Sequence, residues 1–185
     1  MPMNRVRKAA YMVAELALRL CVNPYWRGNL LRLLGAKIGQ NVRIYEVQFI
    51  NLDDGFHNLT VGNDVHIGTG CLLDLCAPIA IGEKSTISLR TTILTHADPG
   101  SHQGSFLCAQ FPPVKLAVRI GNDCWIGCNS TILHGVSIGD RTVVGAASLV
   151  RRDADADSIY FGVPARRVRS LAGEHTDARR VSRTT

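Results

Sequence analysis

An aliphatic residue recurs at every sixth position between residues 120 and 150. The set consists of Ile120, Ile126, Ile132, Ile138, Val144 and Val150. A strand repeats about every 2 residues and a helix about every 3.6, so neither element alone produces this period. The same spacing occurs upstream in two sets that are two residues out of step with each other, namely Val61, Ile67 and Leu73, then Ile81, Ile87 and Ile93. A fixed period of this length predicts a solenoid.

A second column of small or β-branched residues lies four positions after each aliphatic residue. Its members are Val65, Cys71, Ala77, Ser85, Thr91, Cys124, Ser130, Val136, Thr142 and Ser148. Glycine often follows the aliphatic residue directly, as at Gly62 and Gly127. We expect each hexad to form one short strand and one tight corner, where glycine permits backbone angles that other residues avoid.

Composition indicates one small domain with a narrow core. The chain has 185 residues, of which 46% are hydrophobic and only 6% aromatic, which suits a core stacked from Ile, Val and Leu. A net charge of +6 favours anionic partners. The basic residues collect near both termini without a recognisable binding module, so we expect no nucleic acid among those partners.

The six cysteines do not form a disulfide or zinc pattern. Cys71 and Cys124 occupy the small-residue column, where a thiol acts as a small hydrophobe. Cys124 and Cys128 lack the spacing of a zinc knuckle, and no paired Cys or His set completes one. We therefore expect free thiols, no metal and a reducing cytoplasmic setting.

Residues 1–37 differ from the rest of the chain. They begin basic and continue as an apolar stretch too short to span a bilayer, until Asn23 and Pro24 stop a helix. Met12, Leu16 and Leu20 share one face of that helix. Two interpretations stay open: a helix that caps the open end of the solenoid, or a basic amphipathic segment on an anionic membrane beside a lipid-linked acceptor.

The repeat is interrupted after Ile93 and resumes at Ile120, which leaves residues 97–117 as an extended loop. Long loops on a rigid scaffold often carry function. His96 stands where the chain leaves the repeat, and His102 lies within the loop as the second candidate. Phe106, Leu107, Phe111 and Leu116 give the loop an apolar rim that could extend across a neighbouring subunit.

Several motifs resemble the sugar and xenobiotic O-acetyltransferase branch of the hexapeptide-repeat family. They are "LTHADP", "FPPVK", "IGNDCWIG", "GVSIGDRTVVGAASLV" and "YFGVPARRVR". The resemblance implies an all-β solenoid, a left-handed parallel β-helix over residues 38–168 with the inserted loop and an N-terminal helical segment, followed by a polar tail at 169–185. It also implies three hexads per coil, so that Ile120 stacks on Ile138 and Ile126 on Val144.

The resemblance further implies an acetyl-CoA-dependent O-acetyltransferase that works as a homotrimer. Its acceptor would be a hydroxyl of a sugar or glycan in polysaccharide or glycolipid biosynthesis, acetylated by direct transfer with His96 as general base. An acceptor hydroxyl must lose its proton as it attacks the thioester, and a neutral imidazole is suited to take it, with a gain of about 10²- to 10⁴-fold.

The resemblance assigns the main-chain positions, Pro164 and Trp125, whereas the arginines and aspartates are candidates by their chemistry and position. The cofactor set comprises the main chain at Gly127, Gly145, Ala146 and Ala147, the phosphate-pairing Arg151, Arg152, Arg166 and Arg167, and Pro164 near the adenine. Trp125 would wall the cleft or pack against another subunit. Asp74, and less strongly Asp53 and Asp54, could bind acceptor hydroxyls or orient His96.

Three other functions fit parts of this pattern. An amino sugar could replace the hydroxyl acceptor, because the same base serves an amine. A β-helix without catalytic activity would be a scaffold that does not bind acetyl-CoA. The γ-class carbonic anhydrases share the fold but need three histidines, whereas here His134 is preceded five residues earlier by Asn129.

Overall fold

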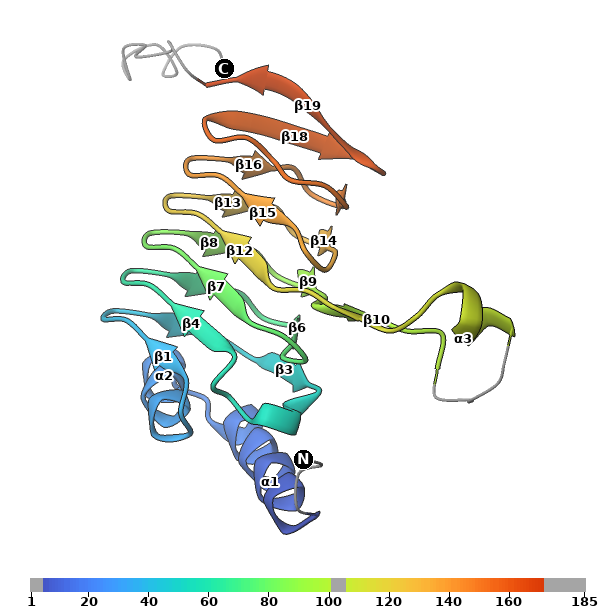
Figure 1. Ribbon diagram of the computed structural model, residues 1–185. Helices are drawn as coiled ribbons and strands as arrows, with labels where there is room; N and C mark the ends of the chain where they lie inside the picture. The colour runs from blue at the N-terminus through green and yellow to red at the C-terminus, as the bar shows by residue number, and fades with distance from the viewer. Residues whose placement is uncertain (1–4, 101–105, 172–185) are drawn as a thin grey trace.

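The computed structural model describes residues 5–100 and 106–171, which form a parallel β-solenoid with two helices at its N-terminal end and an arm that projects from one side (Figure 1). The helices are α1 (Arg5–Leu20), α2 (Pro24–Leu33), the 3-10 turn η1 (Leu52–Asp54) and α3 (Phe106–Gln110) in the arm.

The solenoid strands fall into three sheets, which we name A, B and C in the order in which the chain visits them. Sheet A contains β1 (Lys37–Ile38), β4 (Leu59–Val61), β7 (Ile79–Ile81), β12 (Val118–Ile120) and β15 (Ser137–Ile138). Sheet B contains β2 (Arg43–Ile44), β5 (His66–Ile67), β8 (Thr86–Ile87), β13 (Trp125–Ile126), β16 (Val143–Val144), β18 (Ser158–Gly162) and β19 (Ala165–Ser170). Sheet C contains β3 (Val47–Ile50), β6 (Cys71–Asp74), β9 (Thr92–Ile93), β14 (Thr131–Ile132) and β17 (Leu149–Val150).

The coils stack with the register that three hexads per coil predict. Ile120 pairs with Ile138 in sheet A, and Ile126 pairs with Val144 in sheet B. The repeat aliphatics are at most 3% exposed between residues 120 and 150, and the small-residue column is buried beside them. Its hydroxyls are satisfied, because Ser85, Ser130 and Thr142 each donate to a backbone carbonyl of a neighbouring coil. The predicted solenoid is confirmed.

The glycines after the repeat aliphatics have a different function from the one predicted. Their backbone angles are ordinary, and positive φ occurs two residues later at non-glycine positions such as Asn129 and Arg141. A Cβ at Gly127 would lie 2.5 Å from the backbone nitrogen of Ala146 in the next coil. These glycines therefore allow the coils to approach closely rather than allowing unusual angles.

The N-terminal segment forms two helices rather than one. Asn23 not only follows the first helix but also caps α2, because its side chain accepts hydrogen bonds from the backbone N–H groups of Tyr25 and Trp26. Helix α1 packs on the solenoid through Tyr11, whose ring contacts Phe56 edge to face, and through the buried Leu18. The predicted apolar face of Met12, Leu16 and Leu20 is instead exposed. Both sides of α1 are apolar, so hydrophobic spacing alone did not identify the side that packs.

The C-terminal end is covered by the antiparallel hairpin of β18 and β19, and β19 extends to Ser170 (Figure 1). Of the predicted tail, residues 172–185 lie outside the described residues. The predicted loop leaves the solenoid as the antiparallel pair of β10 (His96–Ala97) and β11 (Val114–Lys115), with α3 beyond it. Phe106, Leu107, Phe111 and Leu116 are exposed in this arm.

Candidate active site

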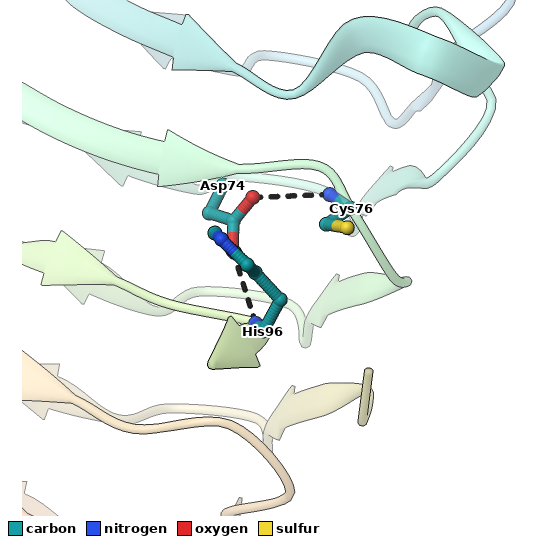
Figure 2. Close-up of side chains that lie close together, drawn as sticks. All are labelled: Asp74, Cys76 and His96. Carbon is teal, nitrogen blue, oxygen red and sulfur yellow. Dashed lines mark hydrogen bonds and ion pairs between the residues drawn. The ribbon is translucent and has the colours of Figure 1, made fainter. Parts of the chain in front are cut away.

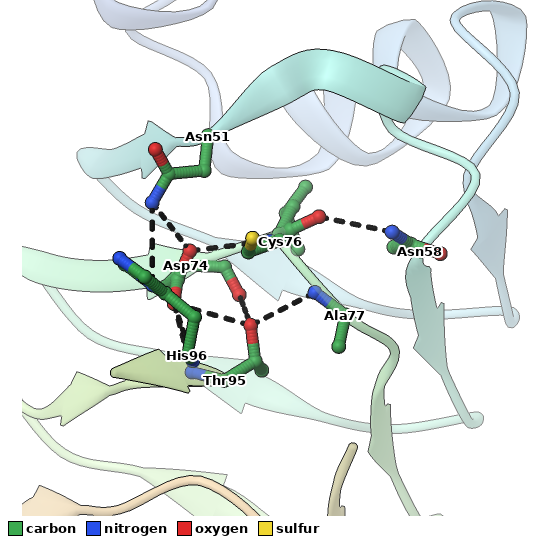
Figure 3. Close-up of polar contacts among 8 residues, drawn as sticks. Asn51, Asn58, Asp74, Cys76, Ala77, Thr95 and His96 are labelled. Atoms are coloured by element: carbon green, nitrogen blue, oxygen red, sulfur yellow. Dashed lines mark hydrogen bonds and ion pairs between the residues drawn. The ribbon is translucent and has the colours of Figure 1, made fainter. Parts of the chain in front are cut away.

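The corner between sheets C and A departs from the regular repeat in three successive coils. The chain inserts η1 after β3, an extra turn after β6, and the whole arm after β9. These coils are neighbours, since β3, β6 and β9 are adjacent in sheet C. Asn51 follows β3, Asp74 ends β6 and His96 begins β10 after β9, so the three side chains meet at one corner of the prism (Figure 3).

Asp74 is the centre of the hydrogen-bond network at this corner. Its side chain is fully buried, and Oδ2 lies 2.5 Å from Nδ1 of His96. The same oxygen accepts from the backbone N–H groups of Thr95 and His96. Oδ1 accepts from Nδ2 of Asn51 at 2.8 Å and from the backbone N–H of Cys76 at 3.1 Å. These donors saturate the carboxylate.

The network keeps Asp74 ionised. Burial by itself would raise the pKa of this carboxyl, but the hydrogen bonds from His96, Asn51 and the backbone hold its pKa below the ordinary value. An ionised carboxylate only accepts hydrogen bonds, so Nδ1 of His96 must carry a proton. In neutral His96 the unprotonated nitrogen is therefore Nε2, which is free to accept a proton from an acceptor.

The ring of His96 is accessible from solvent, with 28% of the side chain exposed. Lys115 lies opposite His96 in the antiparallel arm, at the register position paired with it. Contact with Cys76, and the charges of Asp53 and Asp54, raise the pKa of the Lys115 ammonium. The predicted Asp53 and Asp54, on η1, are thus close to Lys115 of the arm. Charged groups of both signs therefore lie near the histidine.

Asp74, Cys76 and His96 bring an oxygen, a sulfur and a nitrogen atom within 4.8 Å of one another (Figure 2). Such a donor set could hold a soft metal ion. However, both oxygens of Asp74 already accept the donors described above, and a metal would have to displace His96 from Oδ2. The residues fit a hydrogen-bond network better than a metal centre.

The residues predicted to bind the cofactor main chain lie at a different corner, between sheets B and C. Gly127 follows β13, and Gly145, Ala146 and Ala147 follow β16. The tip of the C-terminal hairpin, which carries Pro164, is tied to this corner by a hydrogen bond of 3.1 Å from the backbone nitrogen of Gly162 to Oγ of Ser148.

The four predicted arginines are exposed but do not form one cluster within the chain. Arg166 and Arg167 lie on β19, and a 3.6 Å ion pair joins Arg167 to Asp155. Arg151 and Arg152 follow β17 at the corner between sheets C and A, on the His96 side of the prism. The structure thus separates the predicted phosphate-binding residues into two pairs.

Among the described residues, Trp125 and His134 do not join the His96 network. Trp125 is 57% exposed on sheet B, and its indole nitrogen donates to Oγ of Ser88. His134 follows β14 and lines a hollow of about 460 Å³ against the arm. His102 lies outside the described residues.

Sequence reasoning missed Asn51, Thr95 and Cys76. The available signal was the two-residue slip between Leu73 and Ile81, because a slip marks a corner with extra residues. Such a corner is where Asp74 and Cys76 are found, and Asn51 occupies the equivalent corner one coil earlier.

The chain is thus a solenoid of six-residue repeats, with a histidine and a buried aspartate paired where an arm leaves the prism. The sequence profile of the bacterial transferase hexapeptide family (six repeats) matches residues 117–152. An Escherichia coli K12 protein named for a proposed acetyltransferase role in colanic acid biosynthesis is 36% identical over 140 residues, which are 76% of this chain and 72% of that protein.

Two further proteins, one of them with two solved structures, are similar to this chain. The galactoside O-acetyltransferase of Escherichia coli K12 is 26% identical over 145 residues, covering 78% of this chain and 68% of that enzyme. A hexapeptide-repeat acetyltransferase from Vibrio cholerae superposes with a TM-score of 0.77 at 26% identity, covering 88% of this chain and 89% of its own. A second structure from that species, with acetyl-CoA bound, gives a TM-score of 0.76, also at 26% identity, over 88% of this chain and 86% of its own. The chain belongs to the hexapeptide-repeat acetyltransferase family.

Within residues 5–100 and 106–171, the helices are too short and too polar for one of them to cross a bilayer.

Proposed function

We propose that this protein transfers the acetyl group of acetyl-CoA to a hydroxyl of a sugar or glycan, in polysaccharide or glycolipid biosynthesis. Similarity to a colanic acid biosynthesis protein and to a galactoside O-acetyltransferase supports the acceptor class. The acetyl-CoA complex of the Vibrio cholerae acetyltransferase supports the donor. The observation that carries the mechanism is the His96–Asp74 pair.

In the proposed reaction, Nε2 of His96 takes the proton of the acceptor hydroxyl as its oxygen attacks the thioester carbonyl. The C–S bond then breaks, and the proton passes from the imidazolium to the CoA thiolate. The buried carboxylate of Asp74 holds the ring by its Nδ1–H and stabilises the transient positive charge. No acyl-enzyme is needed.

The main chain at Gly127, Gly145, Ala146 and Ala147 is proposed to hold the pantetheine arm, and Arg166, Arg167, Arg151 and Arg152 the phosphates. In one chain the first group lies at the corner between sheets B and C, whereas His96 lies at the corner between C and A. A complete site then needs two chains, which supports a homotrimer whose grooves lie between subunits.

The buried thiols of Cys71 and Cys124 support a reducing compartment such as the cytoplasm. Cys71 illustrates why: burial raises the pKa of its thiol to about 11, so it remains protonated and unreactive at neutral pH.

The first experiment is calorimetry of acetyl-CoA with the purified protein, because binding is measurable before the acceptor is known. Saturable binding is expected, and a folded protein that does not bind acetyl-CoA would be the scaffold instead. His96→Ala should retain this binding and lower turnover by about 10²-fold or more. His57→Ala, at an exposed histidine on the N-terminal side of the solenoid, is the matched control and should leave both unchanged.

Two further tests address the finer parts of the proposal. Hydroxylamine releases acetyl from an ester but not from an amide, so a resistant product would identify an amino-sugar acceptor. Mixed assemblies of His96→Ala with Arg166→Ala/Arg167→Ala chains should recover activity if each site spans two subunits, since one interface then keeps both groups. If the mixed assemblies recover no activity, the site lies within one chain.

A further inference from the structure

The outer side of helix α1 is apolar. Met12, Val13, Leu16 and Leu20 are between 57% and 73% exposed, and their spacing places them along one side of the helix. The opposite side packs on the solenoid through Tyr11 and Leu18. A helix that is already anchored therefore presents a second apolar side to its surroundings.

Three further apolar side chains are exposed in the residues that follow α1. Val22, between α1 and α2, is 92% exposed, and Trp26 and Leu33 on α2 are 68% and 85% exposed. We call the outer side of α1 together with these three residues the N-terminal surface. Large exposed apolar surfaces of this kind mark contacts with other molecules.

Residues 1–37 also carry a net positive charge, although within this segment Arg27 is buried against backbone carbonyls and Arg19 pairs with Glu15. Residues 1–37 contain seven of the 21 Lys and Arg residues and one of the 15 acidic residues, so this segment carries +6, which equals the net charge of the whole protein. The remaining residues are neutral overall. The partner of the N-terminal surface should therefore combine apolar and anionic character.

We propose that the N-terminal surface docks on an anionic lipid bilayer, with α1 lying in the plane of the interface. Basic amphipathic helices bind membranes in this way, through apolar side chains at the acyl boundary and attraction to anionic headgroups. Trp26 has the amphipathic ring that favours this depth. A second copy of the chain is a poorer partner, because it would bring another segment of +6 against the first.

The docking surface adjoins the proposed active site. Met12 and Glu15 of α1 line one side of a pocket of about 270 Å³, and Phe49, Asn51, Leu52 and Asp53 line the other. Asn51 contacts Asp74 at 2.8 Å and lies 3.4 Å from Nδ1 of His96. A glycan carried on a membrane lipid would thus enter this pocket from the bilayer side. This consequence for the acceptor rests on the proposed function, whereas the docking does not.

The test is flotation of the full chain with phosphatidylcholine vesicles, with and without phosphatidylglycerol. We expect binding to the anionic vesicles that weakens as salt is added. Val13→Gln/Leu16→Gln should lower the bound fraction about tenfold or more. Val168→Gln is the matched control, because Val168 on β19 is 66% exposed, almost as much as Val13, which is 67% exposed. This control variant should bind the vesicles like the unchanged protein.

The proposal is overturned if the unchanged protein does not float with anionic vesicles, or if the double variant floats equally well. Sedimentation velocity of the double variant tests whether the N-terminal surface is instead a contact between subunits. An assembly mass lower than that of the unchanged protein would show such a contact and would also overturn the proposal. Acetyl-CoA calorimetry on the same samples separates the two ideas, since vesicle binding without acetyl-CoA binding would leave docking intact and remove the transferase function.

Discussion

The carboxylate of Asp74 and the imidazole of His96 meet at 2.5 Å although 22 positions separate them in the chain. Asp74 ends β6 and His96 begins β10, directly after β9, the strand that pairs with β6 in sheet C. The stacking of the coils therefore sets the separation of the two side chains before any substrate binds. Such preorganisation is what a proton-transfer site needs.

Asp74→Asn should reduce turnover by about 10²- to 10⁴-fold, because an amide neither enforces the Nδ1–H tautomer of His96 nor stabilises the imidazolium. The KM for acetyl-CoA should stay within about twofold. Thr95→Val is the control: it removes a buried hydroxyl that lies within hydrogen-bond distance of the backbone oxygen and of Oδ2 of Asp74 and accepts from Ala77, but it leaves the His96–Asp74 bond in place. Equal turnover losses in both variants would mean that Asp74 acts only by holding the corner together.

The stability of the protein should depend on pH through Asp74. Its pKa is lowered in the folded state, so ionised Asp74 contributes stability above the unfolded carboxyl pKa of about 4, and this contribution is lost as pH falls through the lower folded value. Asp74→Asn should cost about 1 to 3 kcal/mol near pH 7. In urea unfolding, the free energies of unfolding of the variant and the unchanged protein should converge below about pH 4. A constant difference across this range would contradict the assignment.

Asn51 should support the pair through its amide. Its φ is +56°, a conformation that Gly also adopts easily, so Asn51→Gly removes the amide without straining the backbone. We expect a loss of turnover of about tenfold. Asn51→Asp should lose more, because a second carboxylate beside Asp74 raises the pKa of that group. Steady-state kinetics across pH should show the acidic limb of the Asn51→Asp profile shifted to higher pH. A pH profile identical to that of the unchanged protein would contradict a supporting role for the Asn51 amide.

Two glycine substitutions should separate close packing from backbone conformation. Gly127→Ala should cost about 3 kcal/mol or more, because its Cβ would meet the backbone nitrogen of Ala146 at 2.5 Å. Gly162→Ala meets no atom closer than 3.6 Å, and the strain at a φ of +102° should cost about 1 kcal/mol. Urea midpoints measure both. A smaller cost at Gly127 would show that the coils can separate locally.

The sequence by itself determined the solenoid and the position of its interruption. Each hexad carries one aliphatic and one small residue at fixed positions, and this local pattern can be buried only if successive hexads stack, as Ile126 on Val144 shows. His96 could be found in the same way, because it stands where the pattern stops.

Only the tertiary structure decided which polar residues accompany His96 and which side of α1 faces outward. Asn51 lies 45 positions from His96, and its approach depends on how many extra residues each coil inserts at one corner, which local periodicity does not encode. Helix α1 is apolar on both sides, so the choice between Leu18 and Leu16 depended on the shape of the solenoid end against which it packs. Contacts between coils, rather than the repeat itself, therefore assemble the site.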